Sequence, residues 1–234
     1  MGTANGMIVI AMAARKGGVG KSLLTASLSV LFDRLLRAQW REQQLVDAPP
    51  GDEAPTPAEP EPAQVAIADI DPQGSLTAWH NRRDQIKGPV LVQATPASLS
   101  RDLDRLRRGG FKVVVIDTPP GHGDITGQAM AAASMVVIPA KPGQHDLDAT
   151  LATVAMARAI GARFVVAPND ATYRTVSMGD LVRALVAKRL PMLPPIHHRV
   201  DLALTGGKTA TERFQRSPAV RELEAAFTEL VRII

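Results

Sequence analysis

The chain contains no cysteine, and aromatic residues make up only 3% of its 234 residues. The missing thiols exclude disulfide bonds, thiolate metal sites and cysteine nucleophiles, and their absence fits a reducing compartment. With so few aromatic rings, the core must be aliphatic, and hydrophobic residues are plentiful at 45%. A chain of this length suffices for a single large α/β domain, which we place at 1–234.

Long apolar runs are missing too. A membrane-spanning helix needs about 20 apolar residues, and no uncharged stretch approaches that length. The apolar run at residues 7–14 is followed by Arg15 and Lys16, whereas a signal peptide carries its basic residues before the apolar run. We therefore expect a soluble, cytoplasmic protein that does not bind membranes.

Charge is unevenly distributed along the chain. The formal net charge is +4, but residues 47–62 contain five acidic residues and no Lys or Arg, so the remainder carries +9. Such a basic body favours a polyanionic partner such as DNA, although ordinary solubility charge explains it equally well.

The acidic stretch is also rich in proline, glutamate and alanine, without apolar periodicity. Proline lacks a backbone donor and disfavours helix. We predict a disordered insertion at about residues 46–63 that interrupts the domain.

Short apolar segments alternate with amphipathic ones along the rest of the chain. Strands are predicted at residues 7–13, 65–70, 90–93, 113–116, 135–138, 163–167 and 192–196. Helices are predicted at 21–37 with a possible extension to 44, and at 75–85, 98–108, 125–133, 147–160, 177–189 and 217–234. This order predicts an α/β fold, a single doubly wound, mostly parallel sheet with helices on both faces. In such a sheet, ligands bind beyond the carboxyl ends of the strands.

A glycine-rich loop, R-K-G-G-V-G-K-S at residues 15–22, follows the first predicted strand and precedes the first helix. Glycines let consecutive backbone N–H groups surround an anion, and a helix N-terminus adds the positive end of its dipole. Lys21 is suited to reach the outer phosphates of a nucleotide, and Ser22 supplies a hydroxyl for Mg²⁺. The predicted cofactor-binding residues of this segment are Lys16, Gly17, Gly18, Val19, Gly20, Lys21, Ser22 and Leu23.

Carboxylates stand at the ends of two predicted strands. Asp69 and Asp71 lie in D-I-D-P-Q-G, and Asp117 closes the apolar run V-V-V-I-D. Strand alternation places Asp69 and Asp71 on one face, about 7 Å apart. Carboxylates gathered there need a cation or solvent, and a Mg²⁺-nucleotide supplies a cation. The alternative is that the aspartates at 69 and 71 cap the next helix.

These motifs resemble those of the ParA/MinD family of P-loop ATPases. K-G-G-x-G-K-[ST], at residues 16–22, is similar to the family's deviant Walker A motif, although Arg15 replaces the first glycine of the generic pattern. D-I-D-P-Q-G resembles its switch I segment, and V-V-V-I-D resembles a Walker B strand. The resemblance covers most of the chain from Met7 onward, but the proline-rich insertion has no counterpart in it.

The resemblance implies a P-loop NTPase fold of the SIMIBI type, with ATP/ADP and Mg²⁺ as cofactors. It implies a catalytic set of Lys16, Lys21 and Asp71 and a metal set of Ser22, Asp69 and Asp117. Asn169 would lie near the adenine, with a capping role as the alternative.

The resemblance also implies partners: an ATP-dependent homodimer in which Lys16 reaches the partner's nucleotide, non-specific DNA, and a ParB-like stimulatory protein. It is closest to ParA-type ATPases that partition plasmids or chromosomes, which predicts a nucleoid-associated protein. Two alternatives are a positioning ATPase for a protein cargo, such as a carboxysome or chemoreceptor array, and a nucleotide-binding scaffold without hydrolysis.

Basic residues near the C-terminus are the favoured DNA contacts: Arg174, Arg183, Lys188, Arg189, Arg199, Lys208, Arg213 and Arg216. Another basic stripe, at Arg101, Arg105 and Arg108, alternates with aspartates and is typical of a solvated helix face. The last predicted helix has mixed charges, so we expect its apolar face to pack in the core rather than on lipid. The five histidines lack metal-ligand spacing.

Overall fold

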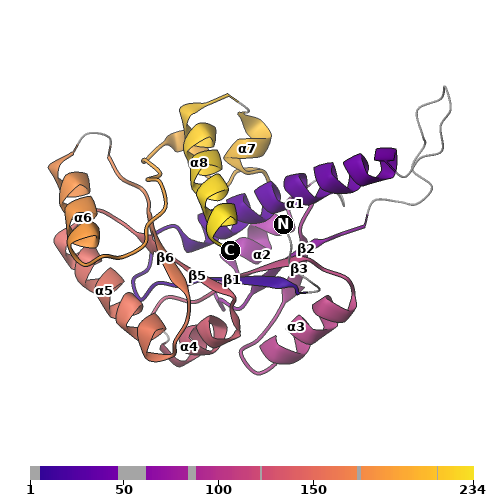
Figure 1. The fold of residues 1–234 in the computed structure, drawn as a ribbon, viewed down its shortest axis with the longest axis horizontal. Helices are drawn as coiled ribbons and strands as arrows, with labels where there is room; N and C mark the ends of the chain where they lie inside the picture. The colour runs from indigo at the N-terminus through magenta and orange to yellow at the C-terminus, as the bar shows by residue number, and fades with distance from the viewer. Residues whose placement is uncertain (1–5, 47–61, 84–87, 122, 173–174, 215) are drawn as a thin grey trace.

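The structure is a computed structural model that describes residues 6–46, 62–83, 88–121, 123–172, 175–214 and 216–234. A six-stranded parallel sheet forms its centre (Figure 1). The strands are β1 (Ile8–Met12), β2 (Val65–Asp69), β3 (Val90–Gln93), β4 (Val113–Asp117), β5 (Met135–Ala140) and β6 (Phe164–Pro168), in the order β3-β2-β4-β1-β5-β6. Every neighbouring pair is parallel, which confirms the predicted sheet.

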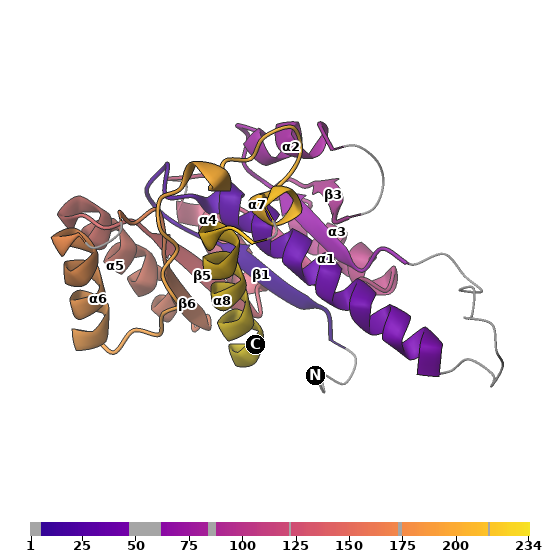
Figure 2. The same ribbon diagram turned by 90° about the horizontal axis from the view of Figure 1, so that it is seen from above.

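Helices cover both faces of the sheet, as predicted (Figures 1 and 2). One face carries α1 (Lys21–Val46), α2 (Ser75–His80), α7 (Ala210–Arg213) and α8 (Pro218–Ile233). The other carries α3 (Leu99–Arg108), α4 (Gly123–Ala132), α5 (Gln144–Ala159) and α6 (Val176–Ala187). In β1, Ile10 and Met12 pack with α1 and α8, while Val9 and Ala11 pack with α3 and α4. Burial on both sides explains why the strand sequences are continuously apolar.

The strand order reverses at β1, which lies between β4 and β5. Because all strands are parallel, the loops that follow β1, β2, β4 and β6 emerge at one edge of the sheet. That edge is where a doubly wound sheet binds its ligands.

The prediction of a seventh strand at residues 192–196 was wrong. The segment runs beside β6, where the Leu193 N–H donates to Val166 O at 2.8 Å and the Ile196 N–H donates to Pro168 O at 2.9 Å. It forms only isolated bridges, at Met192 and His197. Residues 191, 194 and 195 are prolines, which have no N–H to donate, so a continuous ladder cannot form.

Element boundaries differ from the predictions at other points. Helix α1 runs to Val46, and α2 ends at His80, short of the predicted end at Gln85, which lies outside the described residues. The short α7 and a 3-10 turn, η1 (Val200–Leu202), were not predicted. Apart from Val46 and residues 62–63, the predicted insertion at about residues 46–63 also lies outside the described residues.

Helix α8 closes the sheet face that α1 covers. Ser217 caps it, accepting a hydrogen bond from the Val220 N–H at 3.3 Å, and Pro218 takes its first position. Leu223 and Leu230 are fully buried, which confirms the predicted core-packing face. Among the described helices, none has the length and apolarity that a membrane span requires.

Candidate functional site

The glycine-rich loop joins β1 to the N-terminus of α1. Gly18 (φ +71°) and Gly20 (φ +93°) have left-handed backbone conformations that other residues rarely adopt. Helix α1 begins at Lys21, and its first turn closes when the Leu24 N–H donates to Gly20 O at 3.0 Å. The free amides of a helix N-terminus therefore stand at the loop, as an anion cradle requires.

The hydroxyl of Ser22 donates a 2.6 Å hydrogen bond to Asp117 Oδ2 at the end of β4. Thr25, one turn further along α1, donates a longer bond of 3.4 Å to Oδ1 of the same carboxylate. Asp117 is buried, at 1% exposure. Two of the three predicted metal ligands are thus in direct contact although 95 residues separate them.

Burial raises the pKa of Asp117 to about 7, and the negative charges of Asp69 and Asp71 act in the same direction. The Ser22 hydrogen bond and the Lys21 charge oppose this shift. Burial also lowers the pKa of Lys21, although Asp117 and Asp71 raise it. The site holds an excess of carboxylates, which a divalent cation would stabilise.

Asp69 pairs with Asp117 across β2 and β4. Its Oδ2 accepts hydrogen bonds from the Thr77 N–H at 2.9 Å and the Thr77 hydroxyl at 2.6 Å, in the first turn of α2. Its Oδ1 accepts the Asp71 N–H at 3.1 Å. The helix-capping contact considered as an alternative for Asp69 is therefore present. Asp71 instead accepts the Gln73 N–H at 2.9 Å within its own turn.

Metal binding at this edge would need more than carboxylates. Within the described ranges, no three His, Cys, Asp or Glu residues gather closely enough to hold an ion. Mg²⁺ prefers six oxygen ligands, usually one or two from protein with phosphates and water. The hydroxyl and carboxylate pair described above fits a Mg²⁺ ion brought in by a nucleotide.

The predicted signature lysine, Lys16, lies on the opposite side of the loop. Its Nζ forms an ion pair of 2.6 Å with Asp146 Oδ1 in the first turn of α5. The Lys16 side chain is 46% exposed, whereas that of Asp146 is 15% exposed. The neighbouring Arg15 N–H donates to Thr153 Oγ1 at 3.2 Å. Helix α5 thus holds the start of the loop and orients Lys16 within its own chain.

A cavity of about 370 Å³ opens beside the loop. Gly18, Gly20 and Leu23 line one side, and Val200, Leu202 and Ala203 line the other. The sequence did not predict this second wall, because residues 198–205 have no periodic pattern that assigns them to the site.

Asn169 lies at the base of this cavity. Its Nδ2 donates to Val19 O at 2.8 Å, and its Oδ1 is buried without a hydrogen-bond partner among the described residues. A Cβ on Gly20 would overlap the Asn169 amide. The glycine loop therefore packs closely against the end of β6. The Oδ1 of Asn169 is left as a buried acceptor that a donor on a ligand could satisfy.

Asp170, another residue the sequence did not single out, stands at the rim with a φ of +55°. It forms an ion pair with Lys141 and a hydrogen bond with Nδ1 of His198. Burial alone would raise the pKa of Asp170, but Lys141 and His198 together hold it below its usual range. This network fixes the segment that carries the far wall of the cavity to the ends of β5 and β6.

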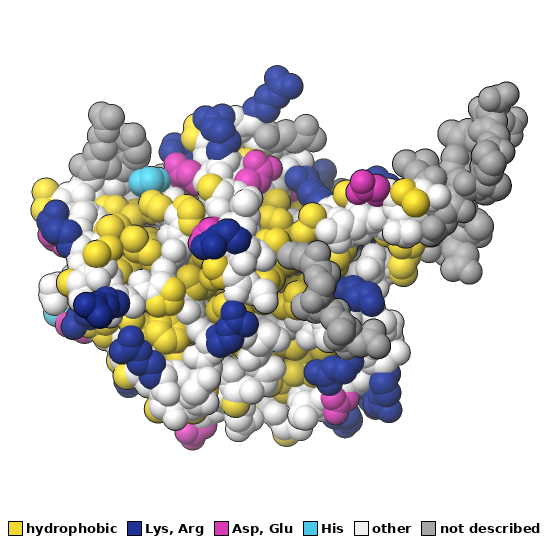
Figure 3. All heavy atoms as spheres, in the orientation of Figure 1, with side chains coloured by type: hydrophobic (Ala, Val, Ile, Leu, Met, Phe, Trp, Pro, Cys, Tyr) yellow, Lys and Arg dark blue, Asp and Glu magenta, His cyan; other side chains and the backbone are white. Residues whose placement is uncertain are grey.

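Lys and Arg side chains are scattered over the face drawn in Figure 3 rather than gathered in one patch. The two basic sets predicted from the sequence differ in their surroundings. On α3, Arg101 and Arg105 pair with Asp102, and Arg107 pairs with Asp104 at 2.6 Å, as on a solvated helix face. In the C-terminal set, Arg183 pairs with Asp180, Arg199 with Glu222, and Arg213 with Thr205. Lys188 and Arg189 are exposed at the end of α6, and Arg174 lies outside the described residues.

No known protein-family model matches the chain. A curated relative, maintenance of carboxysome distribution protein A of Gloeobacter kilaueensis, is 31% identical over 112 residues. That match spans 48% of this chain and 38% of the relative, so it covers well under half of the relative's length.

Solved structures match over nearly the whole chain. McdA of Cyanothece in complex with ATP gives a TM-score of 0.71 at 17% identity, covering 98% of this chain and 96% of McdA. MinD of Pyrococcus horikoshii with Mg-ADP gives 0.72 at 16% identity, covering 97% of each chain. A plasmid partition protein of Borrelia burgdorferi bound to AMPPNP gives 0.68 at 16% identity, covering 97% of this chain and 99% of that one. The chain therefore has the P-loop NTPase fold that MinD and McdA share.

Proposed function

We propose that the chain is an ATPase of the ParA/MinD type that cycles between nucleotide states to position a cellular cargo. The observation that carries the proposal is the contact of Ser22 with Asp117 at the N-terminus of α1. It brings a helix start, a glycine loop, a hydroxyl and a buried carboxylate to one edge of a parallel sheet. These are the parts that hold a Mg²⁺-nucleotide in P-loop proteins.

The residues present fit ATP on two further points. The loop leaves room for phosphate against its backbone at Gly18, where an added Cβ would meet no described atom within 4 Å. The adjoining cavity of about 370 Å³ has the apolar walls and size of a small-molecule site. The free Oδ1 of Asn169 suits an exocyclic amino group, which adenine carries and guanine lacks at the same ring position.

In this proposal Lys21 and the loop amides bind the phosphates, and Ser22 and Asp117 hold the metal shell. Bound Mg²⁺ supplies a Lewis acid that neutralises phosphate charge. The partly buried ammonium of Lys21 adds a fixed positive charge at the same edge, where low dielectric strengthens it. Asp71, in the turn after β2, orients the attacking water, and Asp69 holds the turn through Thr77 while facing the metal shell.

Lys16 has a separate role in the proposal. Its exposed ammonium, oriented by Asp146, stands outside the cradle that Lys21 occupies. In an ATP-bound homodimer Lys16 leaves Asp146 and contacts the partner's nucleotide, where a second cation stabilises the leaving phosphate. The pair between Lys16 and Asp146 belongs to the resting chain.

Substitution of Lys16 tests this assignment. Lys16→Ala is expected to bind a fluorescent ATP analogue as the unaltered chain does, while steady-state turnover falls about 100-fold. Arg232→Ala removes an exposed positive charge in the last turn of α8, which belongs to no proposed site, and serves as the matched control. Normal turnover by Lys16→Ala contradicts the role of this lysine but leaves the nucleotide site intact.

For the cargo, the curated relative favours a protein assembly over the DNA partition expected from the sequence, because its name refers to carboxysome distribution. DNA partition stays the second candidate, since a plasmid partition protein shares the fold. Both cargoes are compatible with non-specific DNA binding as a track and with a stimulatory partner protein. A scaffold without hydrolysis is disfavoured by the acidic residues retained at the strand ends.

A steady-state ATPase assay with and without DNA separates these alternatives. The proposal predicts turnover that DNA and a cargo adaptor together stimulate, with DNA binding that weakens steeply with salt. Absence of hydrolysis under every condition would support the scaffold. Stimulation by a ParB-like DNA-binding protein rather than a cargo adaptor would identify DNA as the cargo.

A further inference from the structure

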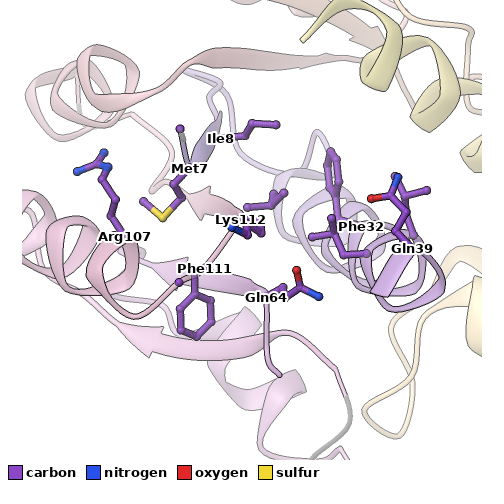
Figure 4. Close-up of a pocket in the computed structure, with 13 residues that line it drawn as sticks. Met7, Ile8, Phe32, Gln39, Gln64, Arg107, Phe111 and Lys112 are labelled. Carbon is purple, nitrogen blue, oxygen red and sulfur yellow. The ribbon is translucent and has the colours of Figure 1, made fainter. Parts of the chain in front are cut away.

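A second cavity, of about 490 Å³, lies at the opposite edge of the sheet, at the amino ends of β1 and β4 (Figure 4). Ile8 lies at one end of β1, and the glycine loop follows its other end, so the five-residue strand separates the two sites by roughly 16 Å. The nucleotide site proposed above therefore leaves this cavity free.

The cavity has an apolar floor from both layers of the core. Phe32 and Leu36 come from α1, and Met7 and Phe111 come from the other side of the sheet. A cavity of this volume, lined by both apolar and polar side chains, is typical of a small-molecule site.

Two cationic side chains line the cavity, those of Lys112 and Arg107, together with the amides of Gln39 and Gln64. Among the described residues that line it, none is acidic. Arg107 is paired with Asp104 at 2.6 Å, whereas Lys112 has no carboxylate partner within the described part of the chain. An anion entering the cavity would meet a positive charge on Lys112 that no carboxylate among the described residues compensates.

The side chain of Gln64 is a second feature of the cavity, separate from the charge of Lys112, that favours an anionic ligand. The Gln64 backbone O accepts hydrogen bonds from the Lys112 and Val113 N–H groups at 2.8 and 3.2 Å. Its side-chain Nε2 is buried and has no hydrogen-bond partner among the described residues. Figure 4 shows the Gln64 amide between Phe111 and Phe32. A buried donor without an acceptor loses the hydrogen bond that it makes to water in the unfolded chain, and a ligand oxygen would restore such a bond.

We propose that this cavity binds a small amphipathic anion, a monocarboxylate with an aliphatic body. The aliphatic part lies against Phe32, Leu36 and Phe111, where burial of apolar surface favours binding. The carboxylate accepts hydrogen bonds from Lys112 Nζ and Gln64 Nε2. A neutral ligand of the same shape lacks the ion pair, and a short carboxylate lacks the apolar contact.

Isothermal titration calorimetry of the full chain tests the proposal with three probes: octanoate, octan-1-ol and acetate. Octanoate is expected to bind at least about tenfold more tightly than octanol, the difference that a charge-assisted hydrogen bond supplies. Acetate is expected to give no saturable heat. Saturating Mg²⁺ and a non-hydrolysable ATP analogue should leave the octanoate affinity unchanged, because the two sites are separate.

Two substitutions locate the site. Lys112→Met keeps the aliphatic stem and removes the charge, and it should weaken octanoate about tenfold without changing octanol. Gln64→Leu should weaken octanoate severalfold, with circular dichroism to verify folding. Lys208→Met is the control and should bind octanoate normally. The proposal is overturned if octanoate does not bind, if octanol binds equally well, if Lys112→Met retains full affinity, or if the ATP analogue competes.

Discussion

The two sides of β1 are built differently at the edge that carries the proposed nucleotide site. On the side of β2 and β4, polar and charged groups lie together: Ser22 donates to Asp117, the charge of Lys21 lowers the pKa of Asp117, and the charge of Asp117 raises the pKa of Lys21. On the side of β5 and β6, the space beside the loop is apolar, and Asn169 supplies a polar atom. The charged side is suited to binding phosphate and metal, and the apolar side is suited to binding a nucleotide base. One glycine loop borders both a charged and an apolar region, because it follows the strand at which the sheet order reverses.

Replacement of Asp117 should give the largest effect on the charged side. Because burial raises its pKa to about 7, the folded state without ligand holds a proton that the unfolded state releases near pH 4. Its contribution therefore makes the folded state less stable as pH rises from about 4 to 7, by about 4 kcal/mol in all.

Urea unfolding at a series of pH values measures this effect. The difference in unfolding free energy between Asp117→Asn and the unaltered chain should grow in favour of Asp117→Asn across that interval. A difference that stays constant with pH would show that the Asp117 carboxyl is not buried as described. Asp117→Asn should also lose Mg²⁺-dependent ATP binding.

The two loop glycines differ in their surroundings. A Cβ added to Gly18 would meet open space, whereas a Cβ added to Gly20 would overlap the Asn169 amide. Gly18→Ala carries only the cost of a left-handed backbone, about 1–2 kcal/mol. Gly20→Ala carries the same backbone cost and also displaces the Asn169 amide from Val19 O. Loss of that hydrogen bond should lower the free energy of unfolding by about 1 kcal/mol more. Thermal unfolding of both variants measures the difference, and equal destabilisation would mean that the contact between the loop and β6 contributes nothing.

The smallest effect is expected on the apolar side. Asn169→Ala removes the free acceptor and should weaken ATP about tenfold while leaving inorganic tripolyphosphate binding nearly unchanged. Competition titrations with ATP, GTP and tripolyphosphate measure the affinity of each ligand for Asn169→Ala and for the unaltered chain. If all three ligands weaken together, Asn169 acts by supporting the loop rather than by contacting the base.

The charged side could be predicted from the sequence, whereas the apolar side could not. Asp69 and Asp117 end apolar strands, and Ser22 lies in the first turn of the helix after the glycine-rich loop that follows another strand. Recognising the parallel strands is therefore enough to place these three residues at one edge of the sheet. On the apolar side, Asn169 also follows a strand, but its place near the adenine was implied only by the family resemblance and stays a prediction.

The far wall at residues 200–203 depends on long-range packing. The position of this wall depends on the contacts of Asp170 with Lys141 and His198. It also depends on residues 192–196, whose apolar pattern led to the wrong prediction of a seventh strand. Likewise, the sequence contains Lys16 and Asp146, but only the fold shows that α5 brings them together. The roles assigned to these site residues stay predictions.

Calorimetric titration of the purified chain with ATP, with and without Mg²⁺, tests the proposed nucleotide site most directly. We expect one ATP bound per chain, with an affinity that depends on Mg²⁺ and falls at least about 100-fold in Lys21→Ala. Failure to bind, or binding that neither Mg²⁺ nor Lys21→Ala alters, would contradict the claim that the glycine loop and the facing carboxylates form a Mg²⁺-ATP site.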